Sequence, residues 1–298
     1  MSIHKQAYRR ARMIRVEAWD GYSLGQTLKP SFVRPLFEER GGVYVKIAGR
    51  GKGAKMWQEG KWVVCEDCGL EELMYWSGAW LRRETVRAMA GTLAEVHREL
   101  GLAVSPYDRH LVFIAVFLSR ATSWETNVLR WSRKIFKADS IEDLLKLDFA
   151  LFGSSFQLRQ LNRVFREYVE EVYPLNDPWE ARWALLRLGG VGPKTADAYL
   201  LFAGLDPSAT PIDRHAVRMA RRLGIDGGAP VKSLCARYTC DECPRRNTCL
   251  RARLRGKYGG AAGWVQTAFY LHSTMYCSKN KCYECTLSGV CLDFKRGK

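Results

Sequence analysis

The spacing of apolar residues changes near residue 80 of the chain. Before that point, apolar residues form short β-branched and aromatic runs, such as 43–47 and 61–65, with glycine-rich turns between them. Such runs are typical of an antiparallel β meander. From Arg82 onward, apolar residues recur at about every 3.6 positions, which is typical of amphipathic helices. We therefore predict a β-rich element followed by a mainly α-helical protein, with helices at 83–100, 111–118, 125–136, 140–147, 156–172 and 179–187.

A run of glycines interrupts the helical pattern after residue 187. Gly189, Gly190 and Gly192 permit a tight hairpin between two helices, because glycine adopts positive φ without strain. Pro193 suits the first turn of the helix that follows. The backbone N–H groups of 191–194 would then lie at a helix N-terminus, which favours phosphate binding. We predict a helix-hairpin-helix over 179–201.

Two side chains suited to covalent catalysis lie close to this hairpin. Lys194 is in the first turn of the second hairpin helix, and Asp213 precedes another helix nineteen residues later. A desolvated lysine amine is a nucleophile, and a carboxylate stabilises a developing cation. The plainer interpretations are a phosphate contact for Lys194 and a helix N-cap for Asp213, a role that contributes about 1 kcal/mol. The combination favours a catalytic pair.

The order Gly190-Val-Gly-Pro-Lys194-Thr-Ala196, followed by Asp213-Arg-His215, resembles the helix-hairpin-helix (HhH-GPD) DNA glycosylases. The resemblance implies a two-lobed helical glycosylase body in which Lys194 is the Schiff-base nucleophile and Asp213 stabilises the cationic sugar. It also implies DNA contacts by Gly190, Val191, Gly192, Lys194, Thr195, His215 and Arg120. Gly189 departs from the pattern, since these enzymes often carry proline there.

The same resemblance makes 119–127 the junction that lines the base pocket. Arg120 is then the candidate wedge that fills the gap left by an extruded base, and Trp124 or Asn127 is a candidate for contact with that base. The alternative places Arg120 on the surface and Trp124 in the core.

The implied activity is that of a bifunctional DNA glycosylase and AP lyase. It would excise an oxidised base, 8-oxoguanine or an oxidised pyrimidine, from double-stranded DNA by base flipping and Schiff-base chemistry. One alternative is a monofunctional mismatch uracil or thymine glycosylase, to which 118–122 bears some likeness. Another is a non-catalytic iron–sulfur protein that binds damaged DNA, because helix-hairpin-helices also occur as inert DNA clamps.

Eight of the ten cysteines form two quartets with one irregular spacing, C-x4-C-x2-C-x5-C. The first is Cys235, Cys240, Cys243 and Cys249, and the second is Cys277, Cys282, Cys285 and Cys291. Four thiolates bind a 4Fe–4S cluster or a structural zinc. Because 264–277 resembles the helix that delivers the first cluster ligand in endonuclease III-like glycosylases, we predict a 4Fe–4S cluster in the second quartet. For the first quartet we predict a second 4Fe–4S cluster or zinc. For the two other cysteines, Cys65 and Cys68, we expect a disulfide or two free thiols.

The charge of the chain is strongly basic, with a formal net charge of +16 and a pI near 9.5. Thirteen lysines and arginines stand against five acidic residues from Asp226 to the end, so part of the excess surrounds the cysteine quartets. Such a balance favours a polyanion partner, here double-stranded DNA with a damaged base.

Three regions and a cellular location follow as expectations. The regions are an N-terminal β-rich element (1–80), a helical glycosylase body (81–225), and a cysteine-rich basic region with C-terminal iron–sulfur cluster loops (226–298). The longest apolar run, 111–118, is far shorter than the roughly 20 residues of a membrane span. Met1–Arg10 lacks the apolar core of a signal peptide. We therefore expect an intracellular monomer of the cytoplasm and nucleoid, or of the nucleus, without a membrane partner.

Overall fold

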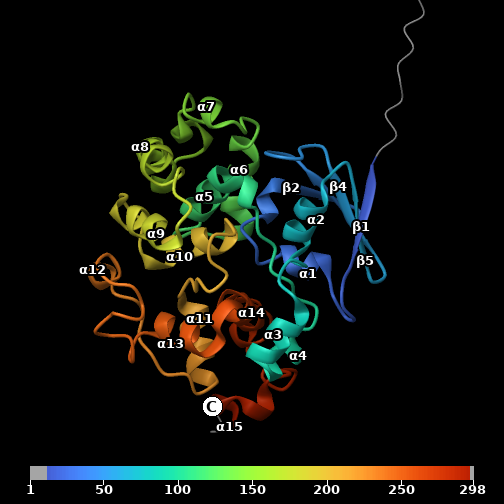
Figure 1. Ribbon diagram of the computed structural model, residues 1–298, viewed down its shortest axis with the longest axis vertical. Coiled ribbons are helices and arrows are strands. Elements are labelled where there is room, and N and C mark those ends of the chain that lie inside the picture. The colour runs from blue at the N-terminus through green and yellow to red at the C-terminus, as the bar shows by residue number, and fades with distance from the viewer. Residues whose placement is uncertain (1–11, 296–298) are drawn as a thin grey trace, which may run out of the picture.

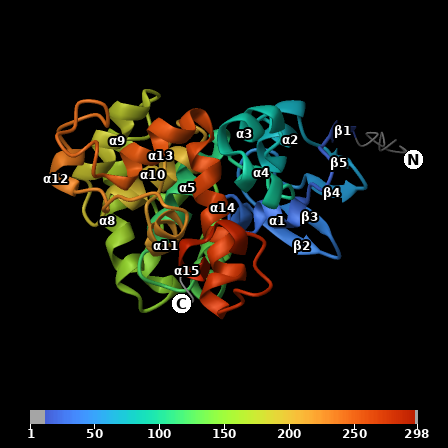
Figure 2. The same cartoon turned by 90° about the horizontal axis from the view of Figure 1, so that it is seen from below.

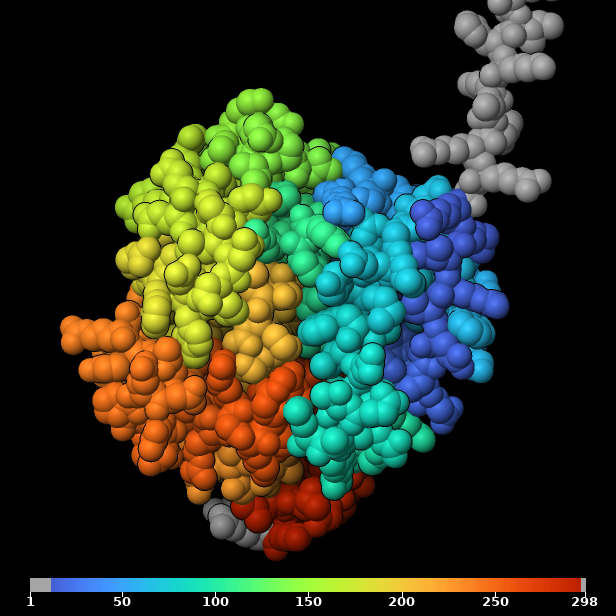
Figure 3. All heavy atoms as spheres, viewed as in Figure 1, coloured from blue at the N-terminus to red at the C-terminus, as the bar shows by residue number. Residues whose placement is uncertain are grey.

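The computed structural model describes residues 12–295, which form three neighbouring groups of elements. A β-rich element lies at one side of the molecule, and two groups of helices lie beside it (Figures 1 and 2). Each group occupies its own sector of the surface in the space-filling view (Figure 3).

The β-rich element is an antiparallel sheet, as the sequence predicted. Its strand order is β1-β5-β4-β3-β2, so β2 to β5 form a meander and β1 pairs with β5 at the edge. The strands are β1 (Met13–Glu17), β2 (Phe37–Arg40), β3 (Val43–Lys46), β4 (Lys55–Glu59) and β5 (Trp62–Glu66). Helices α1 (Leu24–Leu28) and α2 (Leu70–Ser77) pack together, and α2 contacts β1 and β5. Cys65 and Cys68 form a disulfide at the end of β5.

One group of helices is built around α5 (Arg109–Leu118), in which every residue from His110 onward is buried. It packs against α8 (Phe156–Glu171) and α10 (Pro193–Phe202), and α10 packs against α9 (Pro178–Arg187). The group also contains α6 (Leu129–Ile135) and α7 (Ile141–Leu144).

The other group of helices combines the C-terminal region with a segment from early in the chain. Its members are α3 (Arg83–Ala90), α4 (Thr92–Val96), α11 (Arg214–Arg222), α12 (Lys232–Cys235), α13 (Leu250–Tyr258), α14 (Ala262–Met275) and α15 (Leu292–Lys295). Helix α14 contacts α11 and α13, and α13 contacts α3 (Figure 2). Single 3-10 turns occur at Arg34–Leu36, Pro106–Asp108, Phe149–Phe152, Gly259–Ala261, Cys277–Lys279 and Ser288–Val290.

Three predicted helices differ from the observed ones, and the one expected at 140–147 is shortened to the single turn of α7. The helix expected at 83–100 is divided into α3 and α4 by Gly91, which has φ of +51°, a conformation that breaks α-helical geometry. The helix expected at 125–136 begins as a π-helical turn over Trp124–Val128 and becomes α-helical only in α6. Periodicity predicted where these helices occur but not where they break.

A buried ion pair joins the sheet to the helical body. The amine of Lys46, at the end of β3, lies 2.8 Å from a carboxylate oxygen of Asp108, which directly precedes α5. The amine also donates to the carbonyl oxygens of Ala48 and Arg50, at 2.7 and 2.9 Å. Both charged side chains are at most 1% exposed, so their hydrogen bonds offset the cost of burial.

Among residues 12–295, no helix is long and apolar enough to cross a membrane. The sequence predicts no signal peptide in Met1–Arg10. This segment lies outside the described residues.

Candidate active site

The predicted helix-hairpin-helix is formed by α9 and α10. Of the three glycines, only Gly190 adopts positive φ, at +77°, so the tight turn depends on that position. Gly192 has extended backbone and is the N-cap of α10, with Pro193 as the first helical residue. At Gly189, a β-carbon would lie 2.7 Å from the end of the exposed Arg163 side chain, which can move away, so neither φ nor space requires glycine at this position.

The structure changes which backbone amides are free at the phosphate site predicted at 191–194. The amide of Val191 donates to the carbonyl oxygen of Leu188 at 3.2 Å, and Pro193 has no N–H. The first intrahelical bond of α10 runs from Ala196 to Gly192, at 3.0 Å. The amides of Gly192, Lys194 and Thr195 therefore precede the intrahelical ladder and are the ones available to an anion.

Arg120 holds the hairpin against the C-terminal end of α5. Its guanidinium donates to the carbonyl oxygens of Gly190 (2.7 Å) and Phe117 (2.9 Å) and to the side-chain oxygen of Gln160 (2.9 Å). It also lies 3.6 Å from the ring centroid of Phe117, and burial lowers its pKa to about 10. A role as wedge stays a prediction, and it would require these hydrogen bonds to break.

A pocket of about 970 Å³ opens between the β-rich element and both groups of helices. Its lining contains Pro30, Phe32, Ser119, Arg120, Ala121, Thr122, Ser123, Trp124, Glu125, Lys194, Phe202, Pro211, Asp213, Arg214, His215, Gln266, Thr267 and Tyr270. The fold thus brings together Lys194 and Asp213, which the sequence had singled out as a pair.

Lys194 lies at the floor of this pocket in a poorly solvated environment. Its amine donates to the hydroxyl of Ser119 at 3.4 Å and lies 5.4 Å from the ring centroid of Phe32. Burial lowers the pKa of Lys194, and the carboxylate of Asp213 opposes that effect only in part. A lowered pKa increases the fraction of neutral amine, which is the form that attacks an electrophile.

Asp213 is the N-cap of α11. One carboxylate oxygen accepts the amide of Ala216 at 2.8 Å. His215, predicted to contact DNA, has a buried ring whose Nδ1 lies 2.9 Å from the hydroxyl of Ser273, and the ring packs edge-on against Tyr270. The cap orients Asp213, and the buried histidine fixes the first turn of α11 against α14.

The remaining wall of the pocket combines polar residues with the aromatic side chains of Phe32, Trp124, Phe202 and Tyr270. Trp124 packs edge-on against Phe32 with centroids 4.9 Å apart, and Tyr270 and Gln266 belong to α14. Asn127, an alternative candidate for base contact, instead donates its amide to Thr122 at 2.8 Å and is not part of the lining. Phe32 was missed by sequence analysis, because nothing in a short loop before β2 marks it as a neighbour of Lys194.

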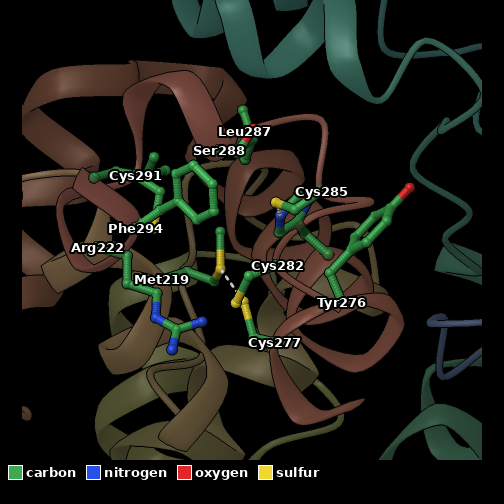
Figure 4. A pocket seen from close by; sticks show the side chains of 12 residues that line it. Met219, Arg222, Tyr276, Cys277, Cys282, Cys285, Leu287, Ser288, Cys291 and Phe294 are labelled. Carbon is green, nitrogen blue, oxygen red and sulfur yellow. Dashed lines mark hydrogen bonds between the residues drawn. The ribbon is translucent and has the colours of Figure 1, made fainter. Parts of the chain in front are cut away.

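The second cysteine quartet gathers around one small cavity. Cys277, Cys282, Cys285 and Cys291 all line it, together with Met219, Arg222, Leu223, His272, Tyr276, Leu287, Ser288 and Phe294 (Figure 4). The sulfur of Cys277 lies 3.6 Å from that of Met219, and Nε2 of His272 lies 3.2 Å from the sulfur of Cys285. The void is about 20 Å³, room for one water molecule, so a cluster would have to displace the lining side chains.

The first quartet is less compact. Cys235 is buried at the end of α12, and Cys240, Cys243 and Cys249 are partly exposed in the loop before α13. Within residues 12–295, no three Cys, His, Asp or Glu side chains of either quartet, or elsewhere, are gathered closely enough to hold a metal ion. The two metal sites therefore stay predictions.

No protein-family model and no curated protein sequence matches this chain. Solved structures do resemble it. The 8-oxoguanine glycosylase/lyase of Clostridium acetobutylicum, in complex with double-stranded DNA containing cytosine opposite 8-oxoguanine, superposes with a TM-score of 0.62 at 16% identity, covering 89% of this chain and 95% of that one. Its apo-form gives 0.61 at 17% identity, over 88% and 97%.

The 3-methyladenine DNA-glycosylase of Archaeoglobus fulgidus gives a TM-score of 0.62 at 16% identity, covering 88% of this chain and 98% of that one. This enzyme is named for a different base from the clostridial one. Because identity is low and coverage is high in all three comparisons, the likeness lies in the arrangement of the elements. This chain therefore has the fold of these DNA glycosylases.

Proposed function

We propose that this protein is a bifunctional DNA glycosylase and AP lyase that removes 8-oxoguanine from double-stranded DNA. The observation that carries the proposal is the half-buried Lys194 with its lowered pKa, facing Asp213 across a pocket at the N-terminus of the second hairpin helix. The helix terminus supplies a phosphate contact beside the nucleophile. DNA anchoring and chemistry are thus adjacent.

The pocket suits a base that has left the duplex. A stacked base is out of reach of Lys194, so the target nucleotide must be extruded, at a cost of a few kcal/mol. Aromatic rings of Phe32, Trp124 and Tyr270 border the pocket and offer stacking surfaces, while Gln266 offers an amide for hydrogen bonds to the base edge. The volume of about 970 Å³ accommodates a nucleoside.

The chemistry assigned to Lys194 is substitution at the sugar. The neutral amine attacks C1′, the bond from C1′ to the base breaks, and the base leaves with the electron pair and takes up a proton. Opening of the sugar gives an imine between Lys194 and C1′. Loss of a C2′ proton then expels the 3′ phosphate by β-elimination, and hydrolysis of the imine frees the lysine.

Asp213 supports this step electrostatically. Positive charge develops on the sugar as the base departs, and a fixed carboxylate near the reacting carbon stabilises it. Because the amide of Ala216 and the fold of α11 hold the carboxylate in place, little reorganisation is needed during the reaction.

The choice of 8-oxoguanine rests on the likeness to the clostridial enzyme, which is an 8-oxoguanine glycosylase/lyase. An oxidised pyrimidine and 3-methyladenine are the competing substrates. Neither alternative needs a lysine with a lowered pKa at position 194. These alternatives are a monofunctional mismatch uracil or thymine glycosylase and a non-catalytic damage-binding protein.

We also propose a 4Fe–4S cluster in the second quartet. Support comes from the convergence of all four cysteines on one cavity, lined otherwise by mainly apolar side chains and by Arg222. Such a cluster would be structural, fixing the basic C-terminal loops, and none of the steps above passes through it.

The test is imine trapping on a panel of duplexes that each contain one damaged base. We expect borohydride to give a covalent adduct with the 8-oxoguanine duplex, and we expect Lys194→Gln to lose the adduct while still binding DNA. Lys146→Gln is the matched control, since Lys146 is exposed and pairs only with Asp143 on the surface.

Each outcome of this experiment discriminates between the candidates. Trapping by Lys194→Gln would assign the nucleophile elsewhere and overturn the proposal. Adducts only with oxidised pyrimidines would keep the mechanism and replace the substrate. Base release without trapping would favour the monofunctional alternative, and binding without release of any base would favour the non-catalytic one.

A further inference from the structure

A buried charge network connects the two hairpin helices to the loop of the first cysteine quartet. Arg182 of α9 donates to Asp197 of α10 at 2.7 Å, and Arg251 of α13 donates to the same carboxylate at 2.9 Å. All three side chains are at most 1% exposed. Asp197 lies on the helix that begins beside Lys194, so the network is packed behind the proposed DNA anchor.

The charges of this network do not balance. Two guanidinium groups share one carboxylate, which leaves about one positive charge in excess, and an uncompensated buried charge costs several kcal/mol. Nη2 of Arg251 is buried and has no hydrogen-bond partner within the described part of the chain. The ring of Trp179 lies 5.2 Å from the Arg251 guanidinium, but a cation–π contact is weaker than a buried counter-charge.

The excess charge faces the first quartet. Nη1 of Arg251 donates to the sulfur of Cys240 at 2.5 Å, and Nη1 of Arg182 donates to the carbonyl oxygen of Cys235 at 3.2 Å. A neutral thiol is a weak acceptor for a buried guanidinium, whereas a thiolate would satisfy both its charge and its hydrogen bond.

The short helix α12 forms a second connection between the quartet and the hairpin. Its first residue, Lys232, donates its amine to the carbonyl oxygen of Val191 at 2.7 Å, inside the hairpin turn. Its last residue is Cys235. If the position of Cys235 is fixed, helix α12 therefore also fixes Lys232 and the backbone beside Gly192.

We propose that Cys235, Cys240, Cys243 and Cys249 bind one thiophilic metal centre, zinc or a 4Fe–4S cluster, which compensates Arg182 and Arg251 and braces the hairpin from behind. On binding, the four thiols release their protons to solvent and the four sulfurs become ligands. With Zn²⁺, or with an oxidised cluster, four thiolates carry a net charge of about −2, which offsets the buried excess.

The sulfurs must move together for this, since they are not gathered in the present conformation. The movement falls on the loop between Cys235 and Cys249, where three of the four cysteines are partly exposed. Metal binding is therefore expected to fix that loop and, through Lys232, the amides at the start of α10. Metal binding and its effect on the hairpin do not depend on glycosylase activity, so their tests are independent of the proposed function.

The first experiment measures metal content. Protein purified anaerobically, and protein reconstituted with zinc or with iron and sulfide, is compared with Cys240→Ser/Cys243→Ser and with the matched control Cys282→Ser/Cys285→Ser. We expect the first variant to lose about one zinc or about four irons per chain relative to the wild type, while the control loses only the metal of the second quartet and keeps that of the first. Which metal is lost identifies the centre.

Two results would overturn the site. One is equal metal content in the wild type and in Cys240→Ser/Cys243→Ser. The other, which needs no variant to fold, is mass-spectrometric detection of the four cysteines as disulfides, or as freely alkylated thiols in metal-loaded wild-type protein.

The second experiment measures the coupling to the hairpin. Amide hydrogen exchange in 188–195 should be slower by about tenfold or more in metal-loaded than in metal-free wild-type protein, because opening of the turn becomes less favourable. Lys232→Met should bind the metal normally and lose most of this difference. Equal exchange in the loaded and metal-free wild type would overturn the bracing role.

Discussion

The amine of Lys194 lies 5.4 Å from the ring centroid of Phe32, although the two residues are far apart in the sequence. Phe32 belongs to the N-terminal β-rich element, whereas Lys194 begins α10. The β-rich element therefore forms part of the pocket that contains Lys194 and Asp213. Its contact desolvates the amine, and desolvation is the main cause of the lowered pKa of Lys194.

The first prediction concerns pH. Imine formation requires neutral Lys194, so its rate should rise with pH to a plateau. The midpoint of this rise should lie below the ordinary lysine pKa of about 10.4. Phe32→Ala should admit water and move the midpoint upward, while Phe32→Leu should preserve burial and change it little. Single-turnover trapping across a pH series measures this, and a wild-type midpoint at the ordinary value would contradict it.

The second prediction separates catalysis by Asp213 from its role as a cap. Asparagine caps helices about as well as aspartate, so Asp213→Asn should cost less than about 1 kcal/mol in the free energy of unfolding. Loss of the carboxylate should lower the single-turnover excision rate by about a hundredfold or more. Asp177→Asn is the control, because Asp177 caps α9 with bonds of 2.9 and 2.8 Å to Trp179 and Glu180. Equal rates for the two variants would reduce Asp213 to a structural residue.

The third prediction follows from the net charge of +16. If about five phosphates are neutralised on binding, log K plotted against log salt should have a slope of about −4 to −5. An undamaged duplex should give a similar slope, because phosphate contacts are independent of sequence. A slope shallower than about −1 would mean that the basic surface does not track DNA.

The fourth prediction concerns the junction between sheet and helices. Asp108→Ala leaves the buried amine of Lys46 without its counter-charge and should cost about 3–5 kcal/mol in the free energy of unfolding. The double variant Lys46→Met/Asp108→Leu removes both charges and should be clearly more stable than Asp108→Ala. Urea denaturation measures both, and equal destabilisation would show that packing, rather than the unpaired charge, dominates.

Some features of the site are encoded locally and could be predicted. The turn at Gly190 requires positive φ, Pro193 can begin a helix but not continue one, and Asp213 accepts the amide three residues later. These constraints act within a few residues, so the sequence alone indicates the hairpin, the start of α10 and the cap of α11. The short β-branched and aromatic runs at 43–47 and 61–65 likewise predicted β3 and β5.

Other features depend on which distant segments pack together. Three contacts join residues from different elements. They are the contacts of Phe32 with Lys194, of Arg120 with Gly190, and of Arg251 with Cys240. Periodicity shows that a helix has a buried face, but not which side chain of another element meets that face. Sequence therefore determined the candidate pair Lys194 and Asp213, the hairpin and the cysteine spacing. Tertiary packing decided how strongly Lys194 is desolvated and which buried charges face the first quartet, because burial and charge compensation are properties of assembled surfaces.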